Sequence, residues 1–213
     1  MKLRKSLLKK SQVYLILDRP SFPRFSLEKI SSLAAGKEIG LIQLRDKLSA
    51  KADVLKFAIK LAKQIGSTKT LFIVNDYVDV AAAALADGVH LGQEDISLKQ
   101  ARKILGQDKI IGISCHNLAQ ALQAQKDGAD YIGIGPIYAT ATKPGYPGIG
   151  LKTAADLKAK IKIPYFAIGN ISEDNIEQIV AAGIRRIAVC RAILKTLDPK
   201  LAAKRLYMKL RII

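Results

Sequence analysis

Two aspartates lie shortly after apolar segments in the middle of the sequence. Asp76 follows the run TLFIVN and Asp95 follows GVHLG, with the amides of Asn75 and Gln93 close by. An acidic residue at the end of a buried strand is costly unless a metal ion, a basic neighbour or a substrate pairs with it. Asp76 alone could equally cap the next helix, but two aspartates with an asparagine favour a metal site.

Cations, amides and hydroxyls lie at the ends of the other apolar segments. They are Gln43, Arg45, Lys47, Ser114, His116, Thr140, Thr142, Lys143, Asn170 and Arg191, and Gly169 and Cys190 lie beside the last two. Carboxylates, cations and hydroxyls on one face suggest magnesium bridging a phosphorylated ligand, since magnesium takes one or two carboxylates and completes its shell with phosphate oxygens and water. Arg45 and Lys47 could instead be surface ion-pair partners of Asp46 or Asp53. His116 is more typical of a structural residue.

A regular set of strands must bring these side chains together. Short runs rich in Val, Ile and Leu alternate with amphipathic stretches, as expected when helices cover a parallel sheet. The runs are VYLILD (13–18), GLIQLR (40–45), TLFIVN (70–75), GVHLG (88–92), KIIGIS (109–114), YIGIGP (131–136), YFAIG (165–169) and RIAVC (186–190). Eight βα units favour an α/β fold, a single (β/α)8 TIM barrel over residues 1–213, ahead of a doubly wound open sheet. Chemistry is then expected where the strands end, on the C-terminal face.

Two helices are indicated most clearly. Residues 50–66 place apolar side chains near one face, with lysines opposite, and Gly66 would end the helix. Residues 172–183 predict another helix, with Ser172 as its N-cap and Gly183 at its end.

The chain is strongly basic, with 35 Lys and Arg against 18 Asp and Glu and a net charge of +17. Such a balance favours an anionic partner. Much of the excess lies in a basic N-terminal extension, residues 1–12, and in the last nineteen residues, where a solvated face explains it better than a nucleic-acid footprint. Because no helix-turn-helix, RNP or zinc-finger signature is present, we expect small phosphorylated molecules rather than nucleic acid as partners.

The sequence also predicts a cytoplasmic protein. No apolar run approaches the roughly 18 residues that a membrane-spanning helix needs. The start, MKLRKSLLKK, lacks the apolar region of a secretory signal. Cys115 and Cys190 are far apart and without metal-ligand spacing, so reduced thiols are expected.

Several motifs in combination carry a family resemblance. The segments QLRDK, NDYVDVAAAALADGVHLGQED, GISCHN, DYIGIGPIYATATK and YFAIGNI…AGIRRIAVCRAI occur in this order between about Tyr14 and Leu194. In this combination the chain resembles the thiamine phosphate synthase (thiamine-phosphate pyrophosphorylase) family. Related proteins that isomerise the thiazole carry a histidine where this chain has Pro136, so the Gly-Pro pair at 135 and 136 favours the synthase.

The resemblance implies a transferase that joins 4-amino-5-hydroxymethyl-2-methylpyrimidine diphosphate to 4-methyl-5-(2-phosphoethyl)thiazole. The products are thiamine phosphate and diphosphate, and magnesium is required. By resemblance, Asp76 and Asp95 hold the magnesium, while Arg45, Lys47, Asn75 and Lys143 hold the diphosphate. Gln43 contacts the pyrimidine, Ser114 lies beside the reacting centre, Thr140 and Thr142 meet the thiazole, and the backbone of Gly169, Asn170, Cys190 and Arg191 holds its phosphate. Lys47, Ser114 and Lys143 are the expected catalytic residues.

Two positions depart from the family pattern. Asn170 follows Gly169 where two glycines are usual, and Arg191 stands where a serine commonly opens a helix. Asn tolerates positive φ well, so its N–H could still meet phosphate. Arg191 either adds a bidentate phosphate contact or crowds the pocket. The alternatives are therefore a protein like the thiazole tautomerases or a non-catalytic regulator that binds a phosphorylated ligand. A homodimer is compatible with any of these functions.

Overall fold

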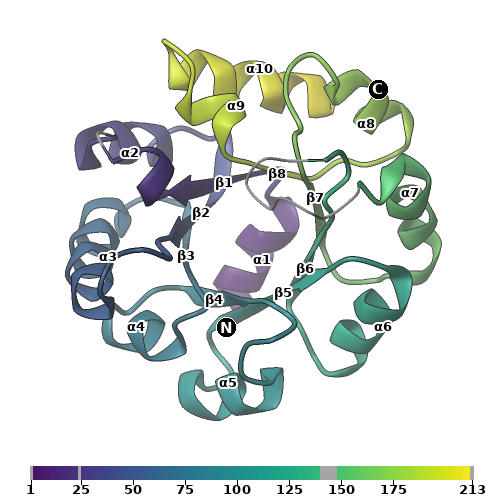
Figure 1. Ribbon diagram of the computed structural model, residues 1–213. Coiled ribbons are helices and arrows are strands. Elements are labelled where there is room, and N and C mark those ends of the chain that lie inside the picture. Colours follow the sequence, from purple (N-terminus) through teal and green to yellow (C-terminus); the bar gives the residue numbers. More distant parts are fainter. Residues whose placement is uncertain (1, 24, 140–147, 212–213) are drawn as a thin grey trace.

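Eight short apolar segments form a closed barrel of parallel strands in the computed structural model, which describes residues 2–23, 25–139 and 148–211. The strands are β1 Val13–Asp18, β2 Ile39–Arg45, β3 Leu71–Asn75, β4 Gly88–Leu91, β5 Ile110–Cys115, β6 Tyr131–Ile134, β7 Tyr165–Ile168 and β8 Ile187–Val189. They neighbour one another in chain order, and β8 pairs with β1 (Figure 1). Each strand lies within about two residues of the run that predicted it, so the (β/α)8 prediction is confirmed.

Helices pack against the strands, most of them around the outside of the barrel and the first of them at the end of the barrel far from the viewer (Figure 1). They are α1 Lys2–Lys10, α2 Leu27–Ala34, α3 Lys51–Ile65, α4 Val78–Ala83, α5 Leu98–Leu105, α6 Leu118–Lys126, α7 Gly150–Lys160, α8 Ile176–Ala181, α9 Arg191–Leu194 and α10 Pro199–Arg211, with a 3-10 turn, η1, at Arg19–Ser21. The predicted apolar face of α3 is confirmed, because Val54, Ala58, Leu61 and Ile65 are buried. Within the described part of the chain, none of these helices has the length and apolar character needed to cross a membrane.

The start of α8 differs from the sequence prediction. The α-helix begins at Ile176, not directly after Ser172. The Ser172 hydroxyl accepts a hydrogen bond from the Asp174 N–H at 3.3 Å, and the Ser172 N–H donates to Asn175 Oδ1 at 3.0 Å. Ser172 therefore closes a local turn that precedes the helix. Serine side chains stabilise such turns as readily as they cap helices, so composition alone does not separate the two.

The basic N-terminal segment forms α1, which lies behind the barrel in the view of Figure 1. Leu8 is only 2% exposed and packs in the same cluster as residues inside the barrel. Arg4 Nε lies 2.6 Å from Asp87 Oδ1, and Lys5 Nζ lies 2.9 Å from Asp130 Oδ1. These two cations therefore tie the helix to the barrel, while their side chains stay partly exposed to solvent.

Aromatic side chains fill the barrel interior. The Tyr14 ring centroid lies 5.4 Å from that of Phe166 and 5.8 Å from that of Tyr131, both in edge-on geometry. A second, larger apolar cluster fills the space between the strands and the helices. The barrel is thus a packed core, as is usual for this fold, and its charged side chains gather at the rim. Burying each such side chain contributes about 1.5–3 kcal/mol to folding.

Candidate active site

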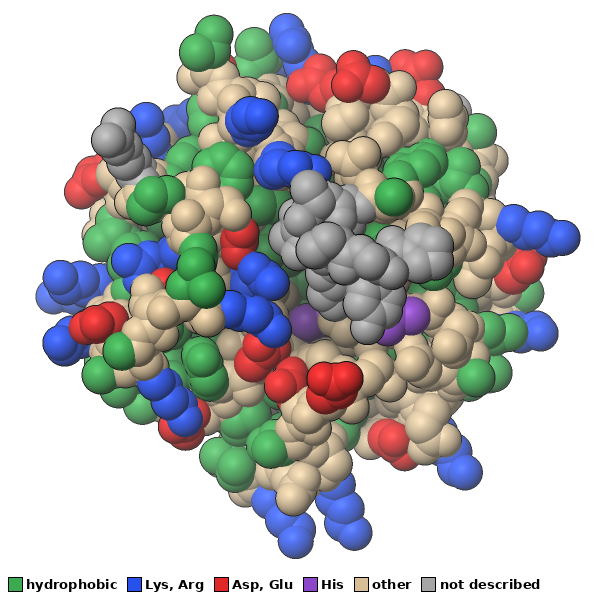
Figure 2. Space-filling model, viewed as in Figure 1, with side chains coloured by type: hydrophobic (Ala, Val, Ile, Leu, Met, Phe, Trp, Pro, Cys, Tyr) green, Lys and Arg blue, Asp and Glu red, His purple; other side chains and the backbone are tan. Residues whose placement is uncertain are grey.

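Charged side chains gather where the strands end. Figure 2 shows this face, with acidic and basic side chains side by side near its centre. The carboxyl ends of β2, β3 and β4 bring Lys47, Asp76 and Asp95 to one side of the mouth, as the sequence predicted. A pocket occupies the other side, at the ends of β5 to β8.

Asp76 and Asp95 are the predicted metal ligands. Lys47 Nζ lies 3.0 Å from Asp76 Oδ2, and the Asp76 side chain is 19% exposed. Burial raises the pKa of Asp76; Lys47 opposes this and the Asp95 carboxyl adds to it. The two carboxylates are therefore close enough to repel each other. A cation between them would relieve that repulsion, because it favours the charged form of both groups.

The local backbone holds these carboxylates in place. Asp76 adopts φ of +61°, a left-handed conformation that Asp tolerates better than most residues. Its N–H donates to the His90 carbonyl at 2.9 Å, which ties the end of β3 to β4. Asp95 Oδ2 accepts the Gly92 N–H at 2.6 Å and so closes the turn after β4.

The donor set fits a hard cation that also binds phosphate. Within the described ranges, no group of three or more His, Cys, Asp or Glu side chains is arranged to hold a metal. Zinc sites in proteins need three or four protein ligands. Magnesium commonly accepts one or two carboxylates and takes the rest of its shell from water and substrate phosphates. Asp76 and Asp95 therefore suit magnesium together with a phosphorylated ligand.

Arg45 forms an ion pair that sequence reasoning missed. Its guanidinium contacts Asp18 at the end of β1, and the two residues are aligned in the register of β1 and β2. The Ser21 hydroxyl donates to the same carboxylate, which is buried. Asp18 is the last residue of the run VYLILD, so the rule that selected the other strand ends would also have found it.

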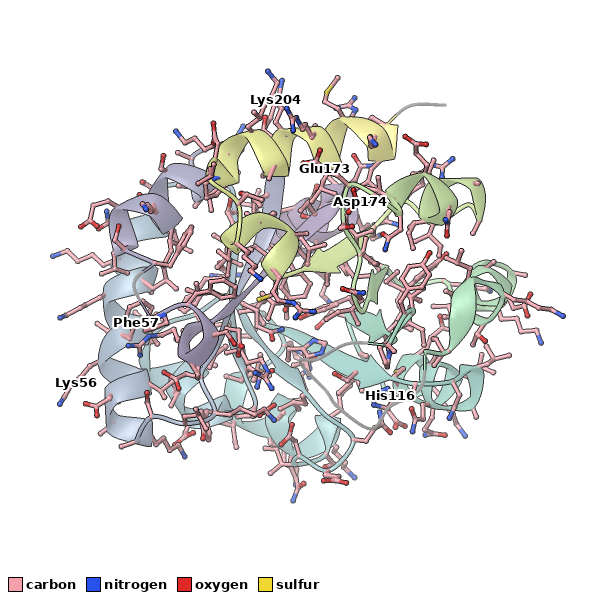
Figure 3. The ribbon with its side chains drawn as sticks, turned by 45° about the horizontal axis from the view of Figure 1, so that its top comes forward. Lys56, Phe57, His116, Glu173, Asp174 and Lys204 are labelled. Carbon is pink, nitrogen blue, oxygen red and sulfur yellow. The ribbon has the colours of Figure 1, made fainter. Side chains whose placement is uncertain are left out.

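The surface ion-pair hypothesis for Arg45 and Lys47 was wrong in its partners. Asp46 Oδ2 lies 3.0 Å from Arg19 Nη1, and Asp53 pairs with Lys56 at 3.3 Å. Asp46 also accepts the N–H groups of Leu48 and Ser49, so it fixes the loop that carries Lys47. Arg19 in turn stacks on the ring of Phe57, 4.1 Å from its centroid, which anchors this loop to α3 (Figure 3).

Gln43 and Ser114 are tied into the barrel interior. Gln43 is 3% exposed, and its Nε2 donates to Tyr14 Oη at 2.5 Å. Ser114 Oγ lies 2.9 Å from His90 Nε2. Sequence reasoning passed over His90, although a histidine in the apolar run GVHLG was a visible signal. Asn75 is half buried at the end of β3, beside His90 in the register of the two strands.

The pocket has a volume of about 530 Å³. Its lining includes Ser114, His116, Pro136, Gly169, Asn170, Asn175, Cys190, Arg191 and Lys195. The prediction that His116 is structural is consistent with its Nδ1, which lies 2.5 Å from the Gly135 carbonyl oxygen. Burial raises the pKa of the Cys190 thiol to about 11, so it stays protonated near neutral pH.

The backbone after β7 takes a conformation that few residues adopt. Gly169 has φ of +114°, and a Cβ there would lie 2.6 Å from the Cα of Pro136. Asn170 has φ of +50°, in agreement with the expectation that it tolerates this region. The Asn175 side chain donates to the Asn170 carbonyl at 2.8 Å. Beside this turn, Glu173 meets Arg205 of α10 at 3.6 Å (Figure 3).

The charged cluster and the pocket meet at Ser114. Ser114 lines the pocket, and its carbonyl accepts a hydrogen bond of 2.5 Å from Gln93 Nε2, which belongs to the turn that also holds Asp95. Arg191 is exposed at the start of α9, on the far side of the pocket. The structure thus places most predicted residues on one face. Thr140, Thr142 and Lys143 lie outside the described residues.

Comparisons with known proteins identify the family of this chain. The thiamine monophosphate synthase family matches residues 13–193. The thiamine-phosphate synthase of Gloeobacter violaceus is 46% identical over 177 residues, 83% of this chain and 52% of that protein. The thiamine-phosphate synthase of Shouchella clausii is 40% identical over 200 residues, 93% of this chain and 96% of that protein. The chain thus spans about half the length of the first relative and nearly all of the second.

A solved structure extends the similarity to the whole described fold. The thiamine phosphate pyrophosphorylase from Pyrococcus furiosus matches with a TM-score of 0.83 and 34% sequence identity, over 98% of this chain and 97% of that one. Sequence and structure therefore agree that the chain belongs to the thiamine monophosphate synthase family.

Proposed function

We propose that this protein joins 4-amino-5-hydroxymethyl-2-methylpyrimidine diphosphate to 4-methyl-5-(2-phosphoethyl)thiazole, forming thiamine phosphate and diphosphate. Family membership and the names of the curated relatives support this reaction. The observation that carries the proposal is the cluster of Lys47, Asp76 and Asp95, next to a pocket large enough for a second substrate.

The reaction needs no protein nucleophile. The bond between the pyrimidine methylene carbon and the diphosphate oxygen breaks, and both electrons leave with the oxygen. The ring amino group stabilises the resulting cation, and the thiazole nitrogen then supplies the electron pair of the new carbon–nitrogen bond. The protein therefore has two tasks, which are to stabilise the departing negative charge and to hold the thiazole in line.

The charged cluster suits the first task. Asp76 and Asp95 would hold a magnesium ion, which supplies positive charge to the departing diphosphate. Lys47 lies 3.0 Å from Asp76 and would share its charge between that carboxylate and the diphosphate. Arg45 and Asn75 end the neighbouring strands and are proposed to complete the diphosphate contacts. Lys143 stays a prediction, since it lies outside the described residues.

The pocket suits the second task. We assign the thiazole phosphate to the turn at Gly169 and Asn170 and to the start of α9 at Cys190 and Arg191, all of which line the pocket. By resemblance, Gln43 is proposed as a pyrimidine contact and Ser114 as the residue beside the reacting centre; the position of Ser114 between the two halves of the site supports its role. Thr140 and Thr142 as thiazole contacts stay predictions.

Diphosphate release by the purified protein tests the proposal. We expect release only when both substrates and magnesium are present, and none after EDTA is added or when the thiazole is omitted. Binding of either substrate without release would instead support the non-catalytic regulator, with Arg191 as the altered position. A cytoplasmic location and a homodimer stay predictions that this assay does not address.

A further inference from the structure

Five polar side chains form a continuous chain of hydrogen bonds across the barrel interior. Gln43 Nε2 lies 2.5 Å from Tyr14 Oη, and Tyr14 Oη lies 2.8 Å from Tyr131 Oη. Tyr131 Oη lies 3.0 Å from His90 Nδ1, and His90 Nε2 lies 2.9 Å from Ser114 Oγ. This hydrogen-bond chain links Gln43 on β2 with Ser114 on β5, two residues that the proposed function places against the substrates.

The surrounding side chains hold this hydrogen-bond chain rigidly. Tyr14, Gln43, Tyr131 and His90 are all buried. Phe166 packs edge-on against both tyrosines, with ring centroids 5.4 Å and 5.7 Å away. Burial raises the pKa of Tyr14 and of Tyr131, so each keeps its phenol proton and can donate one hydrogen bond. In a low-dielectric interior, such a chain strengthens each member and leaves little freedom to reorient.

The amide of Gln43 sets the direction of donation. With Nε2 donating to Tyr14, the Tyr14 hydroxyl donates to Tyr131 and the Tyr131 hydroxyl donates to His90 Nδ1. His90 then carries its proton on Nε2 and donates to Ser114 Oγ. In the opposite direction, Tyr14 would accept two hydrogen bonds and turn its own proton toward the Gln43 amide hydrogens, which is unfavourable in a buried site.

We propose that His90, held by Tyr131, is a positioning residue that fixes the Ser114 hydroxyl as a hydrogen-bond donor to the departing diphosphate. This inference rests on the proposed function, because it concerns the same site. Ser114 accepts from His90, so its own proton is left to point into the pocket. A donor there helps the reaction at the leaving oxygen, where negative charge grows, whereas donation to a pyrimidine nitrogen would destabilise the developing cation.

Tyr131→Phe tests the positioning role while keeping the aromatic packing. We expect kcat to fall about tenfold, because His90 Nδ1 loses its buried partner, with little change in the KM of either substrate. Tyr165→Phe on β7 is the matched control, a half-buried tyrosine that takes no part in the chain. Its kcat should stay at the wild-type value. Equal kcat values for the two variants would overturn the proposal.

A double-mutant cycle separates positioning from general loss of structure. Ser114→Ala removes the group on which His90 acts, and Ser114→Thr keeps the hydroxyl and should restore most of kcat. If Tyr131 acts through Ser114, adding Tyr131→Phe to Ser114→Ala should lower kcat no further. Losses that multiply in the double variant would contradict the proposal.

The tautomer of His90 can be read directly in the wild-type protein. The protein has only two histidines. Nitrogen-15 NMR of the wild type and of His116→Gln therefore identifies the signals of the His90 imidazole. We expect the ring proton to lie on Nε2. Protonation on Nδ1 would overturn the proposed direction of the hydrogen-bond chain. This readout needs no turnover, so a wild-type protein that releases no diphosphate would count against the proposed function alone.

Discussion

Lys47 and Asp76 form an ion pair across the ends of β2 and β3, with Nζ and Oδ2 3.0 Å apart. The lysine side chain is about half exposed, whereas the carboxylate is largely buried. Lys47 therefore replaces part of the stabilisation that the Asp76 carboxylate lost when it was removed from water. It lowers the pKa of Asp76, while burial and Asp95 raise it. Metal binding at Asp76 must therefore depend both on pH and on the positive charge of Lys47.

Replacing Lys47 should expose that coupling. In Lys47→Met, the pKa of Asp76 rises further because the opposing cation is gone. A protonated Asp76 cannot bind magnesium, so the acid limb of the pH–rate profile should move to higher pH. We also expect kcat/KM to fall about 100-fold, as for loss of one charged donor to a leaving group. Lys56→Met on the outside of α3 is the control. If the acid limb lay at the same pH in Lys47→Met and in Lys56→Met, the prediction would be contradicted.

Loss of either carboxylate should weaken magnesium binding. Asp76→Asn preserves the tolerance of positive φ, and Asp95→Asn preserves an acceptor for the Gly92 N–H. Each substitution removes one of two negative charges, so the half-saturating magnesium concentration should rise at least about tenfold. Titration of diphosphate release with magnesium measures this. A variant that saturates at the wild-type concentration would show that its carboxylate is not a ligand.

The turn that lines the pocket after β7 should require a glycine at Gly169. Gly169→Ala combines a φ of +114° with a Cβ only 2.6 Å from Pro136. Gly106, at the end of α5, has φ of +75° but open space around it. Gly106→Ala should therefore cost about 1 kcal/mol from the backbone alone, and Gly169→Ala about 3 kcal/mol or more. Urea unfolding of both variants measures the difference, and equal losses would mean that the Pro136 contact relaxes freely.

The sequence was sufficient to predict the barrel and most of its rim. Most strand residues are apolar and buried, so the eight runs stand out, and polar residues just after them must lie on one face. The same burial on both faces kept the hydrogen-bond chain inside the barrel from being predicted. In a strand buried on both faces, nothing in the pattern tells that Tyr14 points inward or that it meets Tyr131, 117 positions away. Such contacts depend on the register of all eight strands, which single-strand patterns do not contain.

Charge partners were the least predictable feature. The sequence offered Asp46 and Asp53, which are close along the chain, as alternative ion-pair partners of Arg45 and Lys47. The barrel instead pairs residues across adjacent strands, so Arg45 meets Asp18 and Lys47 meets Asp76. The N-terminal helix shows the same effect, because Arg4 and Lys5 find partners at positions 87 and 130.

Arg191 should make binding of the thiazole phosphate depend strongly on electrostatic attraction to its phosphate group. It is exposed at the edge of the pocket, one turn before Lys195, and both line that pocket. Arg191→Ser should raise the KM for the thiazole phosphate about tenfold, because a charge-assisted contact to phosphate is lost, and should leave kcat nearly unchanged. The KM of the wild-type protein should also rise more steeply with salt than that of the variant.

The unphosphorylated thiazole alcohol and a surface variant provide the controls for Arg191. The alcohol lacks the dianion, so Arg191→Ser should alter its binding by less than about twofold. Lys200→Ala on α10 removes an exposed cation outside the pocket and should change neither KM. If Arg191→Ser instead lowered the KM for the phosphorylated thiazole, the side chain would be crowding the pocket, and the contact assigned to it here would be wrong.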